Sequence, residues 1–202
     1  MAVQMCLLSD TTLKILVFQK ERFEQVKKWF EKRDWGSING RILIHPFSLE
    51  RLGPFSYDLC IGDEAFSVRT NQTILLSEKA KAIMEPEDVF IVLTQEYIGL
   101  PRDFAASIMP RFSFVRKGIF QSMTKIDPTW FGKIAVGIAN HSGKSFQLTK
   151  GQPFCTLVIH KLDKRCSRVL DSGHISALGK KSMKHFLRIG EKSRTRECLR
   201  EV

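Results

Sequence analysis

The feature of the sequence that most constrains the fold is a series of short apolar runs, separated by turn signals roughly every ten residues. The runs span residues 41–45, 65–69, 89–94, 106–109, 134–139 and 154–160. Glycine and proline mark many of the breaks, as at Gly53-Pro54, Asp127-Pro128 and Lys150-Gly151. Many short strands at this spacing are typical of an all-β barrel or jelly-roll. We therefore predict one mainly β domain over residues 41–163.

Residues 1–40 follow a helical period instead. Apolar side chains recur at helical spacing, with charged residues between them, at Phe23, Val26, Trp29 and Phe30. Asp10 is a candidate helix cap, and the pattern ends near Gly36. We predict an amphipathic helical segment, broken once, that packs on one side of the β domain.

Residues 164–202 lose both patterns and form a basic tail. The net charge is +11, and residues 161–202 alone hold twelve Lys or Arg against five Asp or Glu. Phosphate groups attract clustered cations, so nucleotides and nucleic acid are both candidate partners of this tail. A solvated tail without a specific partner is the third interpretation.

Composition and motifs argue against several classes of protein. Five cysteines at wide, irregular spacing do not suggest a disulfide framework, which favours a reducing compartment. The sequence has no C-x-x-C pair, no H-E-x-x-H and no H-x-E with P-C-x-x-C, so zinc is not expected. No apolar run reaches the roughly 18 residues of a membrane span, and residues 1–10 lack signal-peptide features. We expect a cytoplasmic protein without membrane contact.

A series of segments, taken in order, resembles the dCTP deaminase family, which shares its fold with trimeric dUTPases. The matching segments are Leu8–Asp10, Ile42–Phe47, Phe55–Gly62, Thr94–Pro101, Arg111–Gly118, Lys125–Ile134, Ala139–Ser142 and Gly151–Val158. The helical part between Asp10 and Arg41 is longer than the family usually shows, so it contains an insertion. The resemblance implies a dUTPase-like β-barrel, a deoxynucleoside triphosphate as ligand, a homotrimer, and Mg2+ held through the nucleotide phosphates.

The segment Arg111–Gly118 matches the family's phosphate motif. By this match Arg111, Ser113 and Arg116 would bind the triphosphate. Their chemistry suits the role, because a guanidinium fork, a hydroxyl and a second cation can all donate hydrogen bonds to phosphate oxygens.

A second match implies the nucleoside side of the site. Asp127 would contact the deoxyribose 3′-hydroxyl or position an attacking water molecule, and it is the candidate catalytic residue. Lys125 and Trp130 flank it as further candidate nucleotide-binding residues. Asp58 matches a position near the family's subunit interface, and we interpret it as structural.

One departure from the family bears directly on catalysis. In the deaminases, a glutamate ten residues beyond the motif aspartate carries the proton that activates water, and here that position is Gly137. Three functions therefore stay open. They are a dCTP deaminase that forms dUTP and ammonia, a dUTP diphosphatase in which Asp127 positions water, and a relative that binds nucleotides without turnover.

Overall fold

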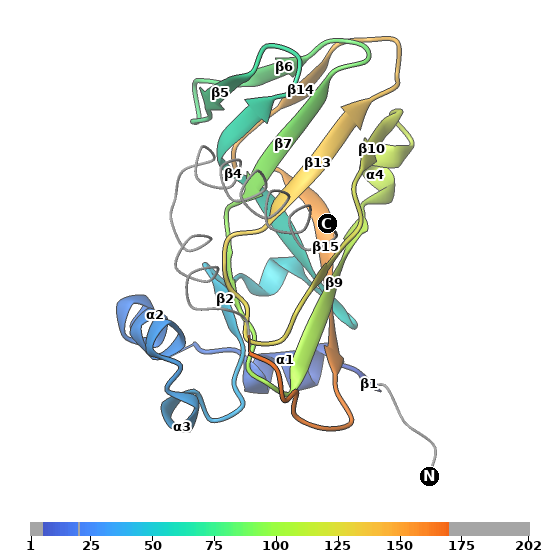
Figure 1. The fold of residues 1–202 in the computed structure, drawn as a ribbon. Helices are drawn as coiled ribbons and strands as arrows, with labels where there is room; N and C mark the ends of the chain where they lie inside the picture. The colour runs from blue at the N-terminus through green and yellow to red at the C-terminus, as the bar shows by residue number, and fades with distance from the viewer. Residues whose placement is uncertain (1–5, 20, 170–202) are drawn as a thin grey trace, which may run out of the picture.

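The computed structural model describes residues 6–19 and 21–169, and strands dominate it (Figure 1). Three helices follow the short strand β1: α1 (Asp10–Leu16), α2 (Phe23–Lys32) and α3 (Trp35–Ile38). The strands are β1 (Cys6–Leu7), β2 (Leu43–His45), β3 (Leu52–Gly53), β4 (Ser56–Ser67), β5 (Gln72–Leu75), β6 (Ala82–Met84), β7 (Val89–Thr94), β8 (Tyr97–Gly99), β9 (Phe104–Pro110), β10 (Ile119–Gln121), β11 (Thr124–Ile126), β12 (Phe131–Gly132), β13 (Ala135–Asn140), β14 (Phe146–Leu148) and β15 (Pro153–Lys161). A 3-10 turn, η1 (Leu49–Arg51), and a short helix, α4 (Phe112–Val115), lie between strands.

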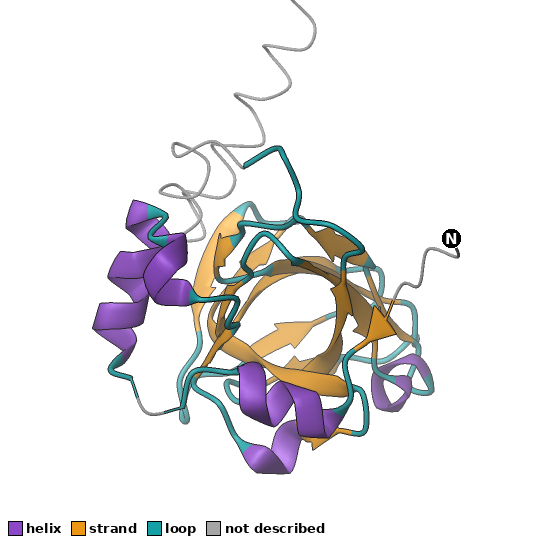
Figure 2. Ribbon diagram, turned by 90° about the horizontal axis from the view of Figure 1, so that it is seen from below, coloured by secondary structure: helices purple, strands orange, loops and turns teal. Residues whose placement is uncertain are grey.

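One antiparallel sheet wraps round to form a barrel. Its strands follow the order β10-β13-β7-β4-β15-β9-β11, and β1, β3 and β5 pair with β15 or β4. The two ends of this order, β10 and β11, are joined directly by Ser122 and Met123, so the sheet closes on itself. The view along the barrel shows this closure (Figure 2). Two small sheets, β12-β8-β2 and β14-β6, complete the body.

Alternating side chains along the strands fill the barrel. In β13, Val136 and Ile138 are buried, whereas Gly137 between them is partly exposed. The interior forms the main core, in which Tyr57 and Phe154 are among the largest fully buried side chains. A second core lies where α2 and α3 meet the sheet β12-β8-β2; its buried members are Phe18, Val26, Phe30, Ile38, Leu43, Tyr97 and Phe131.

The N-terminal residues are helical as predicted, but their boundaries differ from the prediction. Ser9, not Asp10, caps α1, because its Oγ accepts a hydrogen bond from the backbone N of Thr12 at 3.4 Å. The helical part is broken twice rather than once. Arg33 adopts the left-handed conformation after α2, and Asp34 then caps the extra turn α3, which runs past Gly36.

The prediction of a mainly β body is confirmed, and four of the predicted runs lie in β7, β9, β13 and β15. The run at 65–69 is the end of a longer strand, β4, whose register with β7 shifts between Ile61 and Ala65. A bulge of this kind bends a strand sharply. Gly62 lies within it, and a Cβ there would come 2.8 Å from the carbonyl oxygens of Leu93 and Thr94.

Most of the predicted basic tail, residues 170–202, lies outside the described residues. Across the ranges 6–19 and 21–169, the structure contains no helix that is long and apolar enough to cross a membrane.

Candidate functional site

The phosphate segment, residues 111–118, leaves the barrel wall between β9 and β10. After Pro110 the chain makes one helical turn, α4, and Gly118 (φ +75°) directs it into β10. A Cβ on Gly118 would lie 2.8 Å from the Cα of Ser142, so both the backbone conformation and the packing require glycine. Phe114 is buried and anchors the turn. The side chains of Phe112, Ser113 and Arg116 are exposed to solvent.

Arg111 is held at the start of this segment by two strands. Its Nη1 forms an ion pair with Asp58 Oδ2 of β4, and the two side chains are 29% and 30% exposed. Thr156 Oγ1 of β15 donates to the other oxygen of Asp58 at 2.9 Å. A guanidinium has five N–H donors, so Arg111 is oriented by Asp58 and still keeps donors for a ligand.

Ser113 and Arg116 are the ligand-accessible part of the segment. Neither side chain has a hydrogen bond or ion pair with any residue in the described ranges. A hydroxyl and a guanidinium that face solvent beside the oriented Arg111 form a small cationic surface. Such a surface can bind an anionic group with several oxygens.

Hydrogen bonds of two neighbouring residues, Gln121 and Ser122, link the phosphate segment to Gly137, and neither residue was a candidate from the sequence. Gln121 Oε1 accepts the backbone N–H of Arg111 at 3.2 Å. The next residue, Ser122, exchanges two hydrogen bonds with Gly137: Gly137 N donates to Ser122 Oγ at 2.9 Å, and Ser122 N donates to Gly137 O at 2.8 Å. Position 137 therefore has a serine hydroxyl beside it and contributes no carboxylate. Only the register of β10 with β13 reveals this contact.

Lys125, Asp127 and Trp130 form a second group, around the turn that follows β11. Lys125 Nζ and Asp127 Oδ1 are 2.5 Å apart, and their side chains are 78% and 46% exposed. Trp130 N donates to Asp127 O at 3.3 Å, which closes the turn, while Thr129 adopts a left-handed conformation (φ +68°) inside it. Trp130 is half-buried against the main core. An accessible carboxylate here can accept a hydrogen bond from a ligand hydroxyl.

The structure does not bring the two groups together within one chain. In the β9–β11 pair, Thr124 lies opposite Ile108 and Ile126 lies opposite Ala106. Asp127 is therefore level with residue 105, whereas Arg111 lies beyond the other end of β9. At about 3.3 Å per residue, the two side chains are about 20 Å apart along the strand. The sequence alone could not give this separation, because it depends on strand register.

An ion pair between a buried lysine and a partly exposed aspartate anchors the chain as it leaves the Asp127 turn. Lys133 Nζ lies 2.7 Å from Asp63 Oδ1, and the lysine side chain is only 7% exposed. Burial disfavours the ionised form of Asp63, but the hydrogen bond and charge of Lys133 outweigh it and lower the pKa of this carboxyl. Sequence reasoning missed this pair, whose partners are far apart in the chain.

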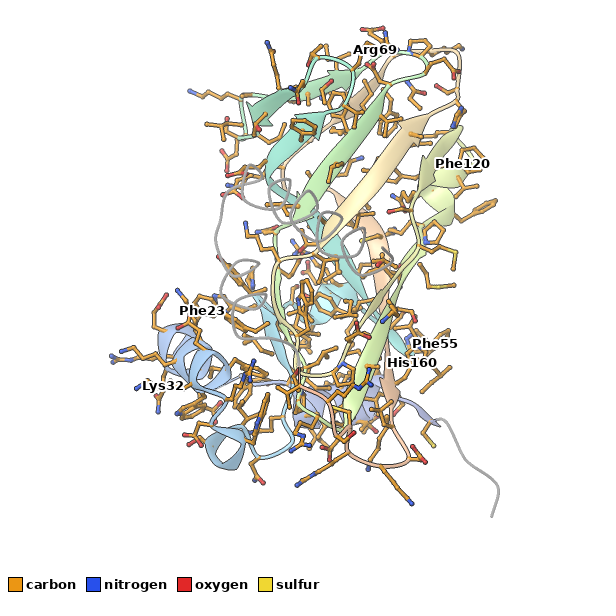
Figure 3. The ribbon with its side chains drawn as sticks, in the orientation of Figure 1. Phe23, Lys32, Phe55, Arg69, Phe120 and His160 are labelled. Carbon is orange, nitrogen blue, oxygen red and sulfur yellow. The ribbon has the colours of Figure 1, made fainter. Side chains whose placement is uncertain are left out.

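Exposed apolar side chains surround the phosphate segment. Phe112 is 77% exposed, Phe120 is 51% exposed and Met123 is 63% exposed. They come from α4, from β10 and from the link between β10 and β11, and Phe120 projects outward from the barrel (Figure 3). We call these three residues the apolar rim. Clustered apolar side chains of this kind often mark an interaction surface.

Comparison with solved structures identifies the class of fold. The chain resembles a 2′-deoxycytidine 5′-triphosphate deaminase from Agrobacterium tumefaciens with a TM-score of 0.53 and 20% sequence identity. The match covers 64% of this chain and 46% of that one, so the chain spans less than half the length of that solved relative. The closed antiparallel barrel is therefore a known fold.

Comparison of sequences identifies the family. A family model described as dCTP deaminase-like matches residues 33–162, and the chain belongs to this family. A dCTP deaminase from Pyrococcus horikoshii is 35% identical over 130 residues, which cover 64% of this chain and 81% of the relative. A dUMP-forming dCTP deaminase from Methanobrevibacter smithii is 29% identical over 143 residues, covering 61% and 74%. The resemblance found in the sequence is confirmed.

Proposed function

We propose that the chain binds dCTP, or a closely related pyrimidine deoxynucleoside triphosphate, and acts in deoxynucleotide metabolism in the manner of a dCTP deaminase. The phosphate segment carries this proposal, with Arg111 oriented by Asp58 and with Ser113 and Arg116 exposed beside it. Fixed cations and hydroxyl donors are the groups that bind a triphosphate. The names of the relatives make dCTP the first ligand to test.

Each site is shared between copies of the chain in this proposal. The phosphate segment and the Asp127 turn are about 20 Å apart along one chain, so one compact nucleotide would contact both only if they came from different copies. A neighbouring copy would also cover the apolar rim. A closed homotrimer, as the resemblance implies, satisfies both conditions.

The side chains of the Asp127 turn would bind the nucleoside. Asp127 accepts a hydrogen bond from the deoxyribose 3′-hydroxyl, and Trp130 forms a wall beside the sugar. Lys125, which forms an ion pair with Asp127, would add a cation near the phosphates. We place this activity in the cytoplasm, in keeping with the four unpaired cysteines of the described ranges.

Mg2+ would enter this site with the nucleotide. The described residues contain no group of three His, Cys, Asp or Glu side chains placed to hold a metal ion, so phosphate oxygens and water would supply most of its ligands. When bound, the ion neutralises phosphate charge. Arg111 and Arg116 would bind the phosphate oxygens that remain.

A second candidate function, nucleotide binding without turnover, is favoured by Gly137. Deamination needs a group that takes a proton from water and passes it to the base, and glycine has none. The neighbouring hydroxyl of Ser122 is a poor base at neutral pH. If the chain does turn over a nucleotide, Asp127 is the candidate carboxylate for activating water. It would serve either deamination or release of diphosphate from dUTP.

The test combines binding with product analysis. Purified full-length protein is titrated with dCTP and with dUTP in the presence of Mg2+ by calorimetry, and dUTP, dUMP, ammonia and diphosphate are measured in the same mixtures. Arg116→Ala should abolish or strongly weaken binding. Lys79→Ala, which removes an exposed cation in the β5–β6 loop, is the matched control and should bind as the unmodified chain does.

The outcomes separate the candidate functions. Product formed from dCTP or dUTP establishes an enzyme and shows which reaction it catalyses. Saturable binding without product supports the binding-only function. If neither nucleotide binds, or if Arg116→Ala and Lys79→Ala behave alike, the proposed nucleotide site is wrong.

A further inference from the structure

The insertion between α1 and β2 forms the second core rather than a separate appendage. Its buried side chains come from residues 18–38 on one side and from the sheet β12-β8-β2 on the other. Figure 1 shows α2 and α3 beside β2, outside the barrel wall. Phe23, labelled on α2 in Figure 3, stacks on His45 of β2 with ring centroids 4.3 Å apart. Helices α2 and α3 therefore pack against the sheet β12-β8-β2.

This second core includes the residue that directly follows the nucleotide-binding turn. Trp130 and Phe131 are consecutive, and they pack into different cores: Trp130 against the main core, Phe131 into the second. The ring of Phe30 on α2 stacks on Phe131 with centroids 5.6 Å apart and an interplanar angle of 15°. The end of the Asp127 turn therefore lies between the two cores, and α2 and α3 contribute buried side chains to the second core.

The contact between α2 and the small sheet is close. Gly99 of β8 lies opposite Phe131 of β12 and opposite Leu43 of β2. A Cβ on Gly99 would come 2.8 Å from Cζ of Phe30, so any larger residue would displace the ring. Glycine at this position lets Phe30 lie directly over the three strands.

The turn itself needs external support. Thr129 is a non-glycine residue in the left-handed region and is 1% exposed, a conformation that persists only where the surroundings enforce it. Leu100 N donates to Trp130 O at 2.9 Å, and Thr94 Oγ1 accepts the N–H of Ile134 at 2.9 Å. These bonds fix the backbone on the side of β7 and β8, and the Phe30–Phe131 stack fixes the side facing the helices.

We propose that helix α2 is a positioning element for the nucleotide-binding turn, and that Phe30 is its positioning residue. Phe30 sets the position of Phe131, which in turn fixes the backbone that presents Asp127. The effect on ligand affinity rests on the proposed function. Because coupling between sites is reciprocal, nucleotide bound at Asp127 should in turn protect α2 from local opening.

Phe30→Leu and Phe30→Ala in the full-length chain test this inference. The matched control is Leu148→Ala, which truncates a fully buried residue of the main core in β14 and does not touch the sheet β12-β8-β2. Two quantities are measured at a temperature at which every variant is folded. The first is hydrogen exchange, without nucleotide, at the backbone amides of residues 100, 127 and 129–132. The second is the dissociation constant of dCTP.

Phe30→Ala should speed exchange at these amides and raise the dissociation constant roughly 5- to 100-fold. Phe30→Leu, which folds more readily, should show the same changes to a smaller degree. Leu148→Ala should lower the melting temperature while leaving both quantities unchanged. Equal exchange at the turn in Phe30→Ala and in the unmodified chain would overturn the proposal, and so would equal effects of Phe30→Ala and Leu148→Ala. If the unmodified chain does not bind dCTP, the proposed function fails, and the exchange measurement alone decides whether α2 fixes the turn.

Discussion

Gly137→Glu should raise dCTP deamination sharply at little cost in stability. The site has room for a side chain, because a Cβ at this position lies 3.4 Å from Ser122 Oγ and 3.6 Å from Ser122 Cβ, which are side-chain contacts at ordinary distances. Replacing a glycine within a strand regains roughly 0.5–1 kcal/mol of conformational entropy. This gain offsets the adjustment of Ser122. We expect the free energy of unfolding to change by less than about 1 kcal/mol.

The expected gain in rate follows from the role of the missing group. A positioned general acid–base typically contributes about 10²- to 10⁴-fold, so dUTP and ammonia should form from dCTP at least about 100 times faster than with the unmodified chain. The assay is chromatography of the nucleotides together with enzymatic detection of ammonia. Gly137→Gln matches the size of the new side chain without its proton transfer, and it should stay at the original rate. Equal rates in all three proteins would show that the missing carboxylate at position 137 does not limit deamination.

Three further predictions concern the groups around the site. Asp58→Asn removes the ion pair that orients Arg111, and calorimetry should therefore show weaker binding of dCTP. An unchanged affinity would contradict this role of Asp58. Because the pKa of Asp63 in the folded chain is lowered from its ordinary value of 3.8, this carboxyl stabilises the fold at pH values above 3.8. The stabilisation is lost as the pH falls through the lowered pKa. In Asp63→Asn, the free energy of unfolding should therefore fall less steeply as the pH is lowered. It should also be lower by roughly 1–3 kcal/mol at neutral pH, because Lys133 loses its charged partner. Burial raises the pKa of Cys60 to about 12, so a thiol reagent at mildly alkaline pH should modify exposed Cys6 in the folded chain and Cys60 only on unfolding. Rapid modification of Cys60 in the folded chain would contradict that burial.

The sequence predicted the class of fold because turn signals and apolar runs are local. The run at 89–94 coincides with β7, and the shift from helical to strand spacing before residue 41 is correct. The predicted helix boundaries were less accurate. Ser9 and Asp10 are both suitable N-cap residues, and the structure uses Ser9. Helix α2 ends at Arg33 in a left-handed conformation, which the sequence does not indicate because glycine is the usual residue there.

The site was predictable only in its parts. Arg111 and Asp127 were identified by resemblance, but their separation depends on the register of β9 with β11. Ser122 belongs to no motif, and only the pairing of β10 with β13 places it beside Gly137. The contact of Phe30 with the strand after the turn likewise depends on the tertiary packing of α2.

Subunit mixing is the sharpest test of whether dCTP binds at a site shared between copies of the chain. Arg116→Ala removes one half of the proposed site and Asp127→Ala removes the other, and the two variants are co-expressed with different tags and purified as mixed oligomers. We predict that neither variant alone binds dCTP, and that the mixed oligomer regains binding at a fraction of its sites, where an intact phosphate segment meets an intact Asp127 turn. Mixed oligomers that form but bind no dCTP, although the unmodified protein does, would contradict a shared site.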